Sequence, residues 1–111
     1  MSDASELAAR YFTGMRARDL PGVLAMFTPD AVLCVPDGRR FDGVEAIGGW
    51  FSHLFGSVGP TPHAVAEVAS PRAIAVEIET TLPDGSVRRT ANFFDLDERG
   101  LISGLRSYAR G

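Results

Sequence analysis

The pattern of hydrophobic and polar positions changes once along the chain. Up to about residue 56, apolar residues recur every three or four positions, which is typical of amphipathic helices. From His63 onward, apolar and polar residues alternate, as they do in half-buried strands. Helices followed by strands predict an α+β domain in which the helices pack on one face of a curved antiparallel sheet.

The first half predicts two helices that meet at a corner. A capping box formed by Asp3 and Glu6 should open the first helix, which we expect to run to about Arg18. Asp19 can cap the second helix, and Pro21 is tolerated in its first turn, where a missing N–H costs nothing. The two helices should therefore form one lobe of the core.

The chain then predicts a strand and a third helix. Thr28-Pro29-Asp30 should end the second helix, and the apolar run 31–35 has the length of a short buried strand. A second capping-box spacing predicts a helix that begins near Gly43. Residues 57–62 should form a loop.

The second half predicts three consecutive strands. They should cover residues 72–82, 86–96 and 101–108, joined by a Pro83-Asp84-Gly85 hairpin and by a turn at 97–100. One face of the middle strand should carry Thr90, Asn92, Phe94 and Leu96.

Size and composition narrow the function classes. The 111 residues fit one domain, 1–111, with 45% apolar and 23% charged residues, as in ordinary globular proteins. A net charge of −3 argues against nucleic acid as a partner, because phosphate binding needs a basic face. Cys34 is the single cysteine, and no apolar run reaches the roughly 20 residues of a membrane span. We therefore expect a cytoplasmic protein without a membrane partner.

Several segments together resemble the nuclear-transport-factor-two-like superfamily. They are RYFTGMRARDLPGVLAMFTPDAVLCVP at 10–36, FDGVEAI at 41–47 and GLISGLRSY at 100–108. Within the superfamily, the chain most resembles SnoaL-like proteins and ketosteroid isomerases, over nearly its whole length. The resemblance implies a cone-shaped barrel made from a strongly bent antiparallel sheet, with three helices packed on its concave side. This fold hosts isomerases, cyclases, hydrolases, dehydratases and proteins without chemistry, so it implies little about function.

The resemblance also implies candidate site residues. Tyr11 matches a helix tyrosine that donates a hydrogen bond to an oxyanion. Asn92 falls where the family places a protonated acid, and a carboxamide can also donate to a carbonyl. Val35, before Pro36, stands where the family has its aspartate base. Since valine cannot move a proton, isomerase chemistry through the usual base is not expected.

Other candidates have an ordinary interpretation beside the functional one. His63 has an unperturbed pKa of about 6.5 and could serve as a base at the mouth of the cone, or could be a solvated residue. Asp37 sits in a Pro-Asp-Gly turn, where aspartate is expected for turn reasons. Tyr11 could be a core aromatic with its hydroxyl paired. Asn92 shares a face with apolar residues, and a buried amide without partners costs about 1–3 kcal/mol.

The first functional hypothesis is a pocket for a small apolar molecule with a carbonyl or hydroxyl. Its polar residues would be Tyr11 and Asn92, and any catalysis would be isomerase- or cyclase-type proton transfer without a cofactor. Two histidines and one cysteine at unrelated spacings predict no metal site. The predicted apolar lining residues are Met15, Val35, Trp50, Phe51, Phe55, Val76, Phe94 and Leu105.

The alternative is a non-catalytic dimerisation or partner-binding module whose pocket is filled by its own side chains. An exposed sheet face bearing Val65 and Phe93 would need cover, so a homodimer is expected under either hypothesis. An epoxide-hydrolase-like activity would need an Asp-Arg-Asp set inside the cone. The pattern offers no inward positions for two aspartates.

Overall fold

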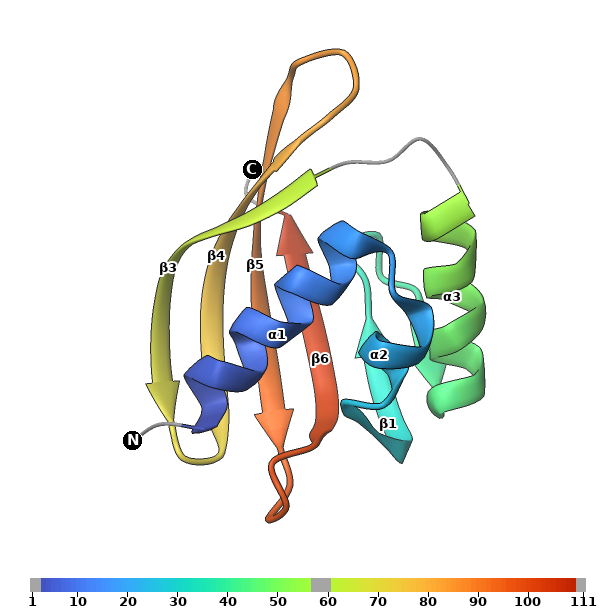
Figure 1. Cartoon of the computed structure of the whole chain (residues 1–111), viewed down its shortest axis with the longest axis vertical. Helices are drawn as coiled ribbons and strands as arrows, with labels where there is room; N and C mark the ends of the chain where they lie inside the picture. Colours follow the sequence, from blue (N-terminus) through green and yellow to red (C-terminus); the bar gives the residue numbers. More distant parts are fainter. Residues whose placement is uncertain (1–2, 57–60, 110–111) are drawn as a thin grey trace.

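The computed structural model describes residues 3–56 and 61–109 (Figure 1). The elements are α1 (Asp3–Ala17), α2 (Leu20–Leu24), β1 (Phe27–Cys34), β2 (Arg40–Asp42), α3 (Val44–Gly56), β3 (Thr61–Ser70), β4 (Ala73–Thr81), β5 (Val87–Leu96) and β6 (Ile102–Ala109). In the loop predicted at 57–62, residues 57–60 lie outside the described residues, and the last two residues begin β3.

The six strands form one sheet in the order β2-β1-β6-β5-β4-β3. The predicted α+β cone with three helices is confirmed. The sheet is mixed rather than wholly antiparallel, because β1 and β6 run parallel, with Leu33 beside Leu105. A parallel pair needs a long connection, and α3 with β3 to β5 supplies it. The sheet does not close into a barrel, so β2 and β3 remain its edges.

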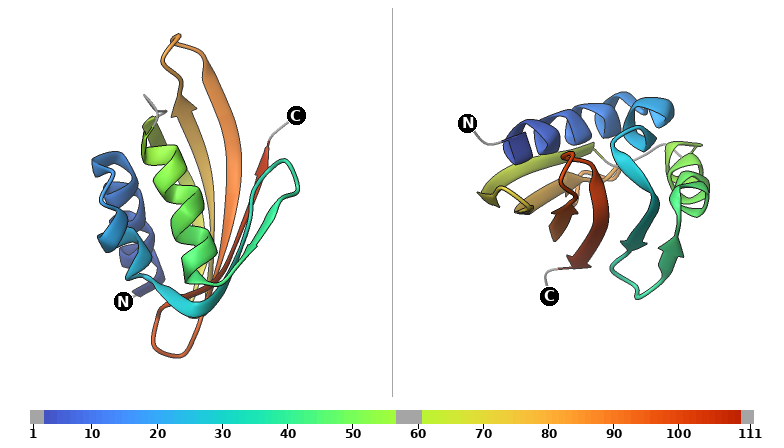
Figure 2. Two further views of the ribbon diagram at one scale, coloured as in Figure 1. Left: turned by 90° about the vertical axis from the view of Figure 1, so that its right-hand side faces the viewer. Right: turned by 90° about the horizontal axis from the view of Figure 1, so that it is seen from below.

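The three helices cover the concave side of the sheet. α1 packs on β3 and β4, α3 packs on β1 and β2, and α2 contacts both other helices. Figure 2 shows that the elements lie close together where α3 begins and spread apart toward the projecting β4–β5 hairpin. Among the described residues, no helix combines the length and apolarity needed to cross a membrane.

The corner between α1 and α2 forms as the sequence predicts. The Asp19 carboxylate accepts a hydrogen bond from the Gly22 backbone N–H at 3.2 Å, and Pro21 lies in the first turn of α2. Gly14 lets the helices approach closely: a Cβ at this position would lie only 2.9 Å from Val23 Cγ2. Val23 is fully buried as a result.

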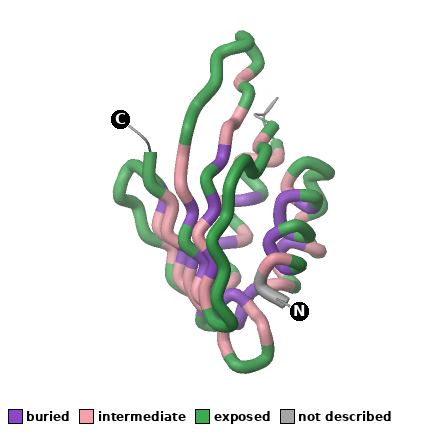
Figure 3. The backbone as a smooth tube through the Cα atoms, turned by 90° about the vertical axis from the view of Figure 1, so that its left-hand side faces the viewer, coloured by how far each residue is buried: buried purple, intermediate pink, exposed green. Residues whose placement is uncertain are grey.

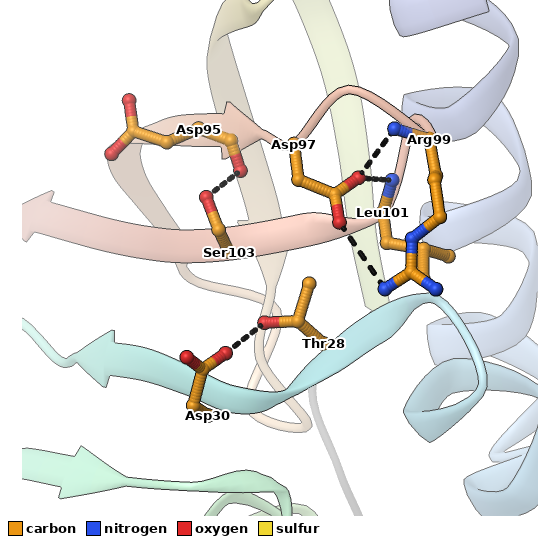
Figure 4. A network of polar contacts seen from close by, with 7 residues as sticks. All are labelled: Thr28, Asp30, Asp95, Asp97, Arg99, Leu101 and Ser103. Carbon is orange, nitrogen blue, oxygen red and sulfur yellow. Dashed lines mark hydrogen bonds and ion pairs between the residues drawn. The ribbon is translucent and has the colours of Figure 1, made fainter.

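β1 begins earlier than the sequence predicts. Thr28, Pro29 and Asp30, which we expected to end the second helix, lie inside the strand. The pairing with β6 shifts register between Phe27 and Val32, and this irregularity tolerates a proline that has no N–H to donate. Within this irregular segment, the Thr28 hydroxyl donates a hydrogen bond to the Asp30 carboxylate at 3.0 Å (Figure 4). The short strand β2 was not predicted.

The predicted hairpins of the second half are confirmed. β4 and β5 pair antiparallel around the 83–85 turn, and burial alternates over 73–78 and 91–96, away from the hairpin (Figure 3). At the β5–β6 turn, the Asp97 carboxylate accepts hydrogen bonds from the backbone N–H groups of Arg99 and Leu101, both at 2.9 Å (Figure 4). Gly100 takes a φ of 81°, which favours glycine. The buried face of β5 carries Asn92, Phe94 and Leu96.

Candidate functional site

A cavity of about 210 Å³ lies between α1, α3 and the concave face of the sheet. Its apolar walls include Met15, Leu33, Val35, Trp50, Phe51 and Leu105. Its polar lining residues are Tyr11, Thr80, Arg88, Thr90, Asn92 and Ser107. An apolar hollow with a few convergent polar groups is the usual composition of a small-molecule site.

Most of the predicted apolar lining residues line this cavity: Met15, Val35, Trp50, Phe51 and Leu105. The other three lie in the packing around it. Phe94 is fully buried with its ring centroid 5.1 Å from that of Tyr11, and Phe55 stacks on Phe51 at 6.0 Å. Val76 is buried beneath α1 and contributes to a separate groove.

Tyr11 lies in the middle of α1 and is only 3% exposed. Its ring makes edge contacts with Phe12 and Phe94, with centroids at 5.1 Å in both cases, so neighbouring aromatics hold it in place. Desolvation by burial raises the pKa of Tyr11 above its ordinary value. The phenol therefore keeps its proton and remains able to donate a hydrogen bond to a ligand in the cavity.

Asn92 is the most informative polar residue of the site. It lies on β5 beside Val76 of β4 and Ser107 of β6, and it is 7% exposed. Its Oδ1 atom is buried and has no hydrogen-bond partner among the residues that the structure describes. An unpaired buried acceptor costs about 1–3 kcal/mol, so this oxygen favours occupancy by a group that donates a hydrogen bond.

The polar residues of β5 extend from the inside of the cavity toward its mouth. Asn92, Thr90 and Arg88 share one face because side chains alternate along a strand, and Arg88 pairs in register with Thr80 near the hairpin. Arg88 is exposed, whereas Asn92 is buried. Among the described residues that line the cavity, none is Asp, Glu or His, so it offers hydrogen bonds but no side-chain base.

His63 lies elsewhere. It lines a groove of about 420 Å³ between α1 and β3, together with Thr13, Arg16 and Glu67. Polar contacts cross this groove: Ser5 donates to the Glu67 carboxylate at 2.6 Å. The structure thus brings Tyr11 and Asn92 together in one cavity and leaves His63 in another.

Asp37 does not line the cavity either. Its carboxylate accepts hydrogen bonds from the Arg39 side chain at 2.8 Å and from the Arg39 backbone N–H at 3.0 Å. These hydrogen bonds lower the pKa of Asp37, which is exposed in the turn before β2. A structural role in the turn therefore accounts for the contacts of Asp37. Within 3–56 and 61–109, no group of three His, Cys, Asp or Glu side chains is arranged to hold a metal ion.

The convex face of the sheet carries exposed apolar side chains, as the sequence predicts. Phe93 and Tyr108 meet edge to face at 5.7 Å, and Arg106 lies 5.9 Å from the Phe93 ring centre. Arg106 also pairs with Asp95. Among the residues that the structure describes, the exposed large apolar ones are Val65, Val68, Val87, Phe93 and Tyr108.

Sequence reasoning missed Arg88, Thr80 and Ser107. Arg88 could have been predicted from the pattern, because it lies two positions before Thr90 and continues the alternation of Thr90 and Asn92. Ser107 could not have been predicted, because its position beside Asn92 depends on the register between β5 and β6.

The sequence profile of the SnoaL-like domain matches residues 8–104. The chain belongs to the SnoaL-like domain family. Among curated protein sequences, none matches this SnoaL-like chain. Similar solved structures share the fold of this chain. One is a nuclear-transport-factor-two-like protein of unknown function from Cytophaga hutchinsonii (11% identity, TM-score 0.82, covering 99% of this chain and 92% of the other).

Two further solved structures carry functional descriptions. A candidate ketosteroid isomerase from Kribbella flavida has 18% identity and a TM-score of 0.87, covering 98% of this chain and 78% of the other. A computationally designed 17-OHP binder has 24% identity and a TM-score of 0.84, covering 99% of this chain and 92% of the other. At these identities, the likeness concerns the fold alone.

Proposed function

We propose that this SnoaL-like protein binds a small apolar molecule bearing a hydroxyl or carbonyl in the cavity between α1, α3 and β5. The observation that carries the proposal concerns Asn92, which lines a mostly apolar hollow and whose buried side-chain oxygen has no partner among the described residues. A ligand hydroxyl would satisfy this oxygen, and the Tyr11 phenol would donate to the same oxygen function of the ligand. The fold of this chain is shared with a designed 17-OHP binder, which supports a ligand-binding role.

The volume of the cavity limits its ligand. A dry cavity of about 150 Å³ can hold benzene, and pockets for drug-sized ligands measure about 300–1,000 Å³. At about 210 Å³, this cavity fits one or two rings. A larger ligand would extend through the mouth into solvent.

We propose binding rather than proton abstraction as the main role. The resemblance to ketosteroid isomerases puts a base where this chain has Val35, whose side chain has no ionisable group. None of the described lining residues is a carboxylate or histidine. Any isomerase- or cyclase-type turnover would then rest on polarisation of the ligand oxygen by Tyr11 and Asn92.

A titration of the ¹⁵N-labelled protein with 2-naphthol, followed by NMR, tests the proposal. We expect saturable shifts at the backbone amides of Tyr11, Val35 and Asn92. Val35→Phe should fill the cavity and abolish these shifts, whereas Val87→Phe, an equal change at an exposed position outside it, should not. Absence of binding at millimolar 2-naphthol, or equal binding by both variants, would contradict the proposal.

A second role is favoured by the convex face. Its exposed Phe93, Tyr108 and Val68 form an apolar surface that a second copy of the chain would cover, so we also propose a homodimer. Such a dimer leaves the cavity accessible and is compatible with ligand binding. Sedimentation should give a dimer that Phe93→Lys dissociates, and a strictly monomeric wild type would exclude it. If the dimer forms but no ligand binds, a partner-binding module is the better description.

A further inference from the structure

The polar groups of the cavity lie at two separate positions along β5. Asn92 lies inside, and Arg88 lies four residues away on the same face, toward the hairpin. At about 3.3 Å per residue, the two Cα atoms are roughly 13 Å apart. A ligand with polar groups at both ends could reach both residues, whereas a ligand with one polar group could reach only one.

Arg88 differs from its neighbour Arg89. Arg89 points to the convex face and pairs with Glu79 at 3.2 Å. Arg88 lines the cavity, and no ion pair joins it to another described residue. Since none of the described lining residues is acidic, Arg88 is the charged group at this mouth. A guanidinium presents paired N–H donors that match a carboxylate.

Asn92 sets the chemistry of the other end. Its unpaired atom is an acceptor, which an ether, ester or ketone oxygen cannot satisfy. A ligand hydroxyl can. The two ends of the cavity therefore select different groups: a donor inside and an anion at the mouth.

We infer that the ligand of this cavity is an apolar hydroxy acid of one or two rings, whose hydroxyl donates to Asn92 Oδ1 and whose carboxylate binds Arg88. This inference rests on the proposed function and narrows it to a class of ligand. The apolar middle of the molecule would lie against Trp50 and Ile78, which both line the cavity; Ile78 pairs in register with Thr90, midway between Arg88 and Asn92.

Three naphthalenes test the inference by calorimetry. The compound 6-hydroxy-2-naphthoate carries the donor and the anion at opposite ends of two fused rings. Its 6-methoxy analogue lacks the donor, and 2-naphthol lacks the carboxylate. We expect 6-hydroxy-2-naphthoate to bind about tenfold more tightly than either, since a hydrogen bond to a charged group or to a buried orphan acceptor is worth that much.

Variants assign each preference to a residue. Arg88→Gln should make 6-hydroxy-2-naphthoate bind no better than 2-naphthol. Arg89→Gln removes the same charge from the adjacent position on the convex face and should leave the preference intact. Asn92→Leu should remove the preference for the hydroxy compound over its methoxy analogue. The preference for the carboxylate should also fall as salt is raised.

The outcomes separate this inference from the proposed function. If 2-naphthol binds and the three compounds have equal affinity, or if Arg88→Gln and Arg89→Gln weaken binding equally, the hydroxy-acid inference is overturned and the pocket stands. If none of the three binds at millimolar concentration to the folded wild type, the proposed function itself fails.

Discussion

The polar groups on the two faces of β5 differ in whether they have interaction partners. On the convex face, Asp95 pairs with Arg106 and Arg89 pairs with Glu79, at positions that remain accessible to water. On the concave face, the Asn92 oxygen is buried and unpaired. Exposed ion pairs contribute little to stability and need no functional explanation, whereas an unpaired buried amide has a cost. This difference supports the proposal that the concave face binds a ligand.

The apolar residues of β5 divide in the same way. Phe94 is 0% exposed and packs against Tyr11, whereas Phe93 is 38% exposed. The concave face thus holds the core together as well as lining the cavity. Stability and binding can be separated by variants on the two faces.

The largest expected effect comes from the two phenylalanines. Phe94→Ala should lower the free energy of unfolding by about 3–5 kcal/mol, because it leaves a cavity in the core. Phe93→Ala, the matched change on the convex face, should lower the stability of the monomer by less than about 1 kcal/mol, compared at protein concentrations too low for the proposed dimer to form. Urea unfolding measures both. Equal losses would mean that the two faces are not distinguished by burial.

Asn92→Leu should change stability in the opposite direction. It replaces an unpaired buried amide with an apolar side chain of similar size, so the free energy of unfolding should rise by about 1–3 kcal/mol while 2-naphthol binding falls. Ser107→Ala, at the neighbouring position on β6, is the control and should leave stability nearly unchanged. A less stable Asn92→Leu variant would show that the amide is already paired in the free protein.

Alkaline pH should destabilise the protein through Tyr11, which lies on the concave side of the sheet. Burial raises the folded-state pKa of Tyr11 above its ordinary value of 10.0, so the stability it contributes is present below pH 10.0 and is lost as pH rises further. In Tyr108→Phe, Tyr11 is the remaining tyrosine. Phenolate absorbance in this variant should therefore appear together with loss of the near-ultraviolet circular dichroism signal. Ionisation of the intact fold near pH 10.0 would contradict the burial of Tyr11.

Acidic pH should lower the stability by a smaller amount, through Asp97 in the β5–β6 turn. The hydrogen bond from the Leu101 backbone N–H, followed by that from Arg99, lowers the folded-state pKa of Asp97 below its ordinary value of 3.8. Its contribution to stability is therefore present above pH 3.8 and is lost as pH falls below it. Asp97→Asn should flatten this acid dependence in urea unfolding at several pH values. An unchanged profile would assign the dependence to other carboxylates.

The sequence predicts those parts of the fold that depend on local pattern. Period-two alternation identified the buried face of β5, including Asn92, and the Asp19 cap fixed the α1–α2 corner. Thr28-Pro29-Asp30 was wrongly predicted as the end of the second helix, because that signal is local and the pairing with β6 that overrides it is not. The parallel pairing of β1 with β6 joins residues far apart in the chain and leaves no local signal.

The site was predicted less completely, for a similar reason. The family resemblance and the alternation along β5 identified Tyr11 and Asn92 as candidate site residues. Whether an inward-facing residue lies in the packed core or at the mouth of the cavity depends on how the helices pack on the sheet. Phe94 points inward and fills space against Tyr11, whereas Arg88 points to the same side and reaches the mouth. Periodicity assigns a face and does not distinguish packed core from open cavity.

A crystal structure of the protein with 2-naphthol tests the role of Asn92 most directly. The naphthol oxygen should lie about 2.7 Å from Asn92 Oδ1, with the rings against Trp50 and Ile78. A ligand bound outside this cavity, or one whose hydroxyl points away from Asn92, would contradict the assignment of this oxygen to a ligand.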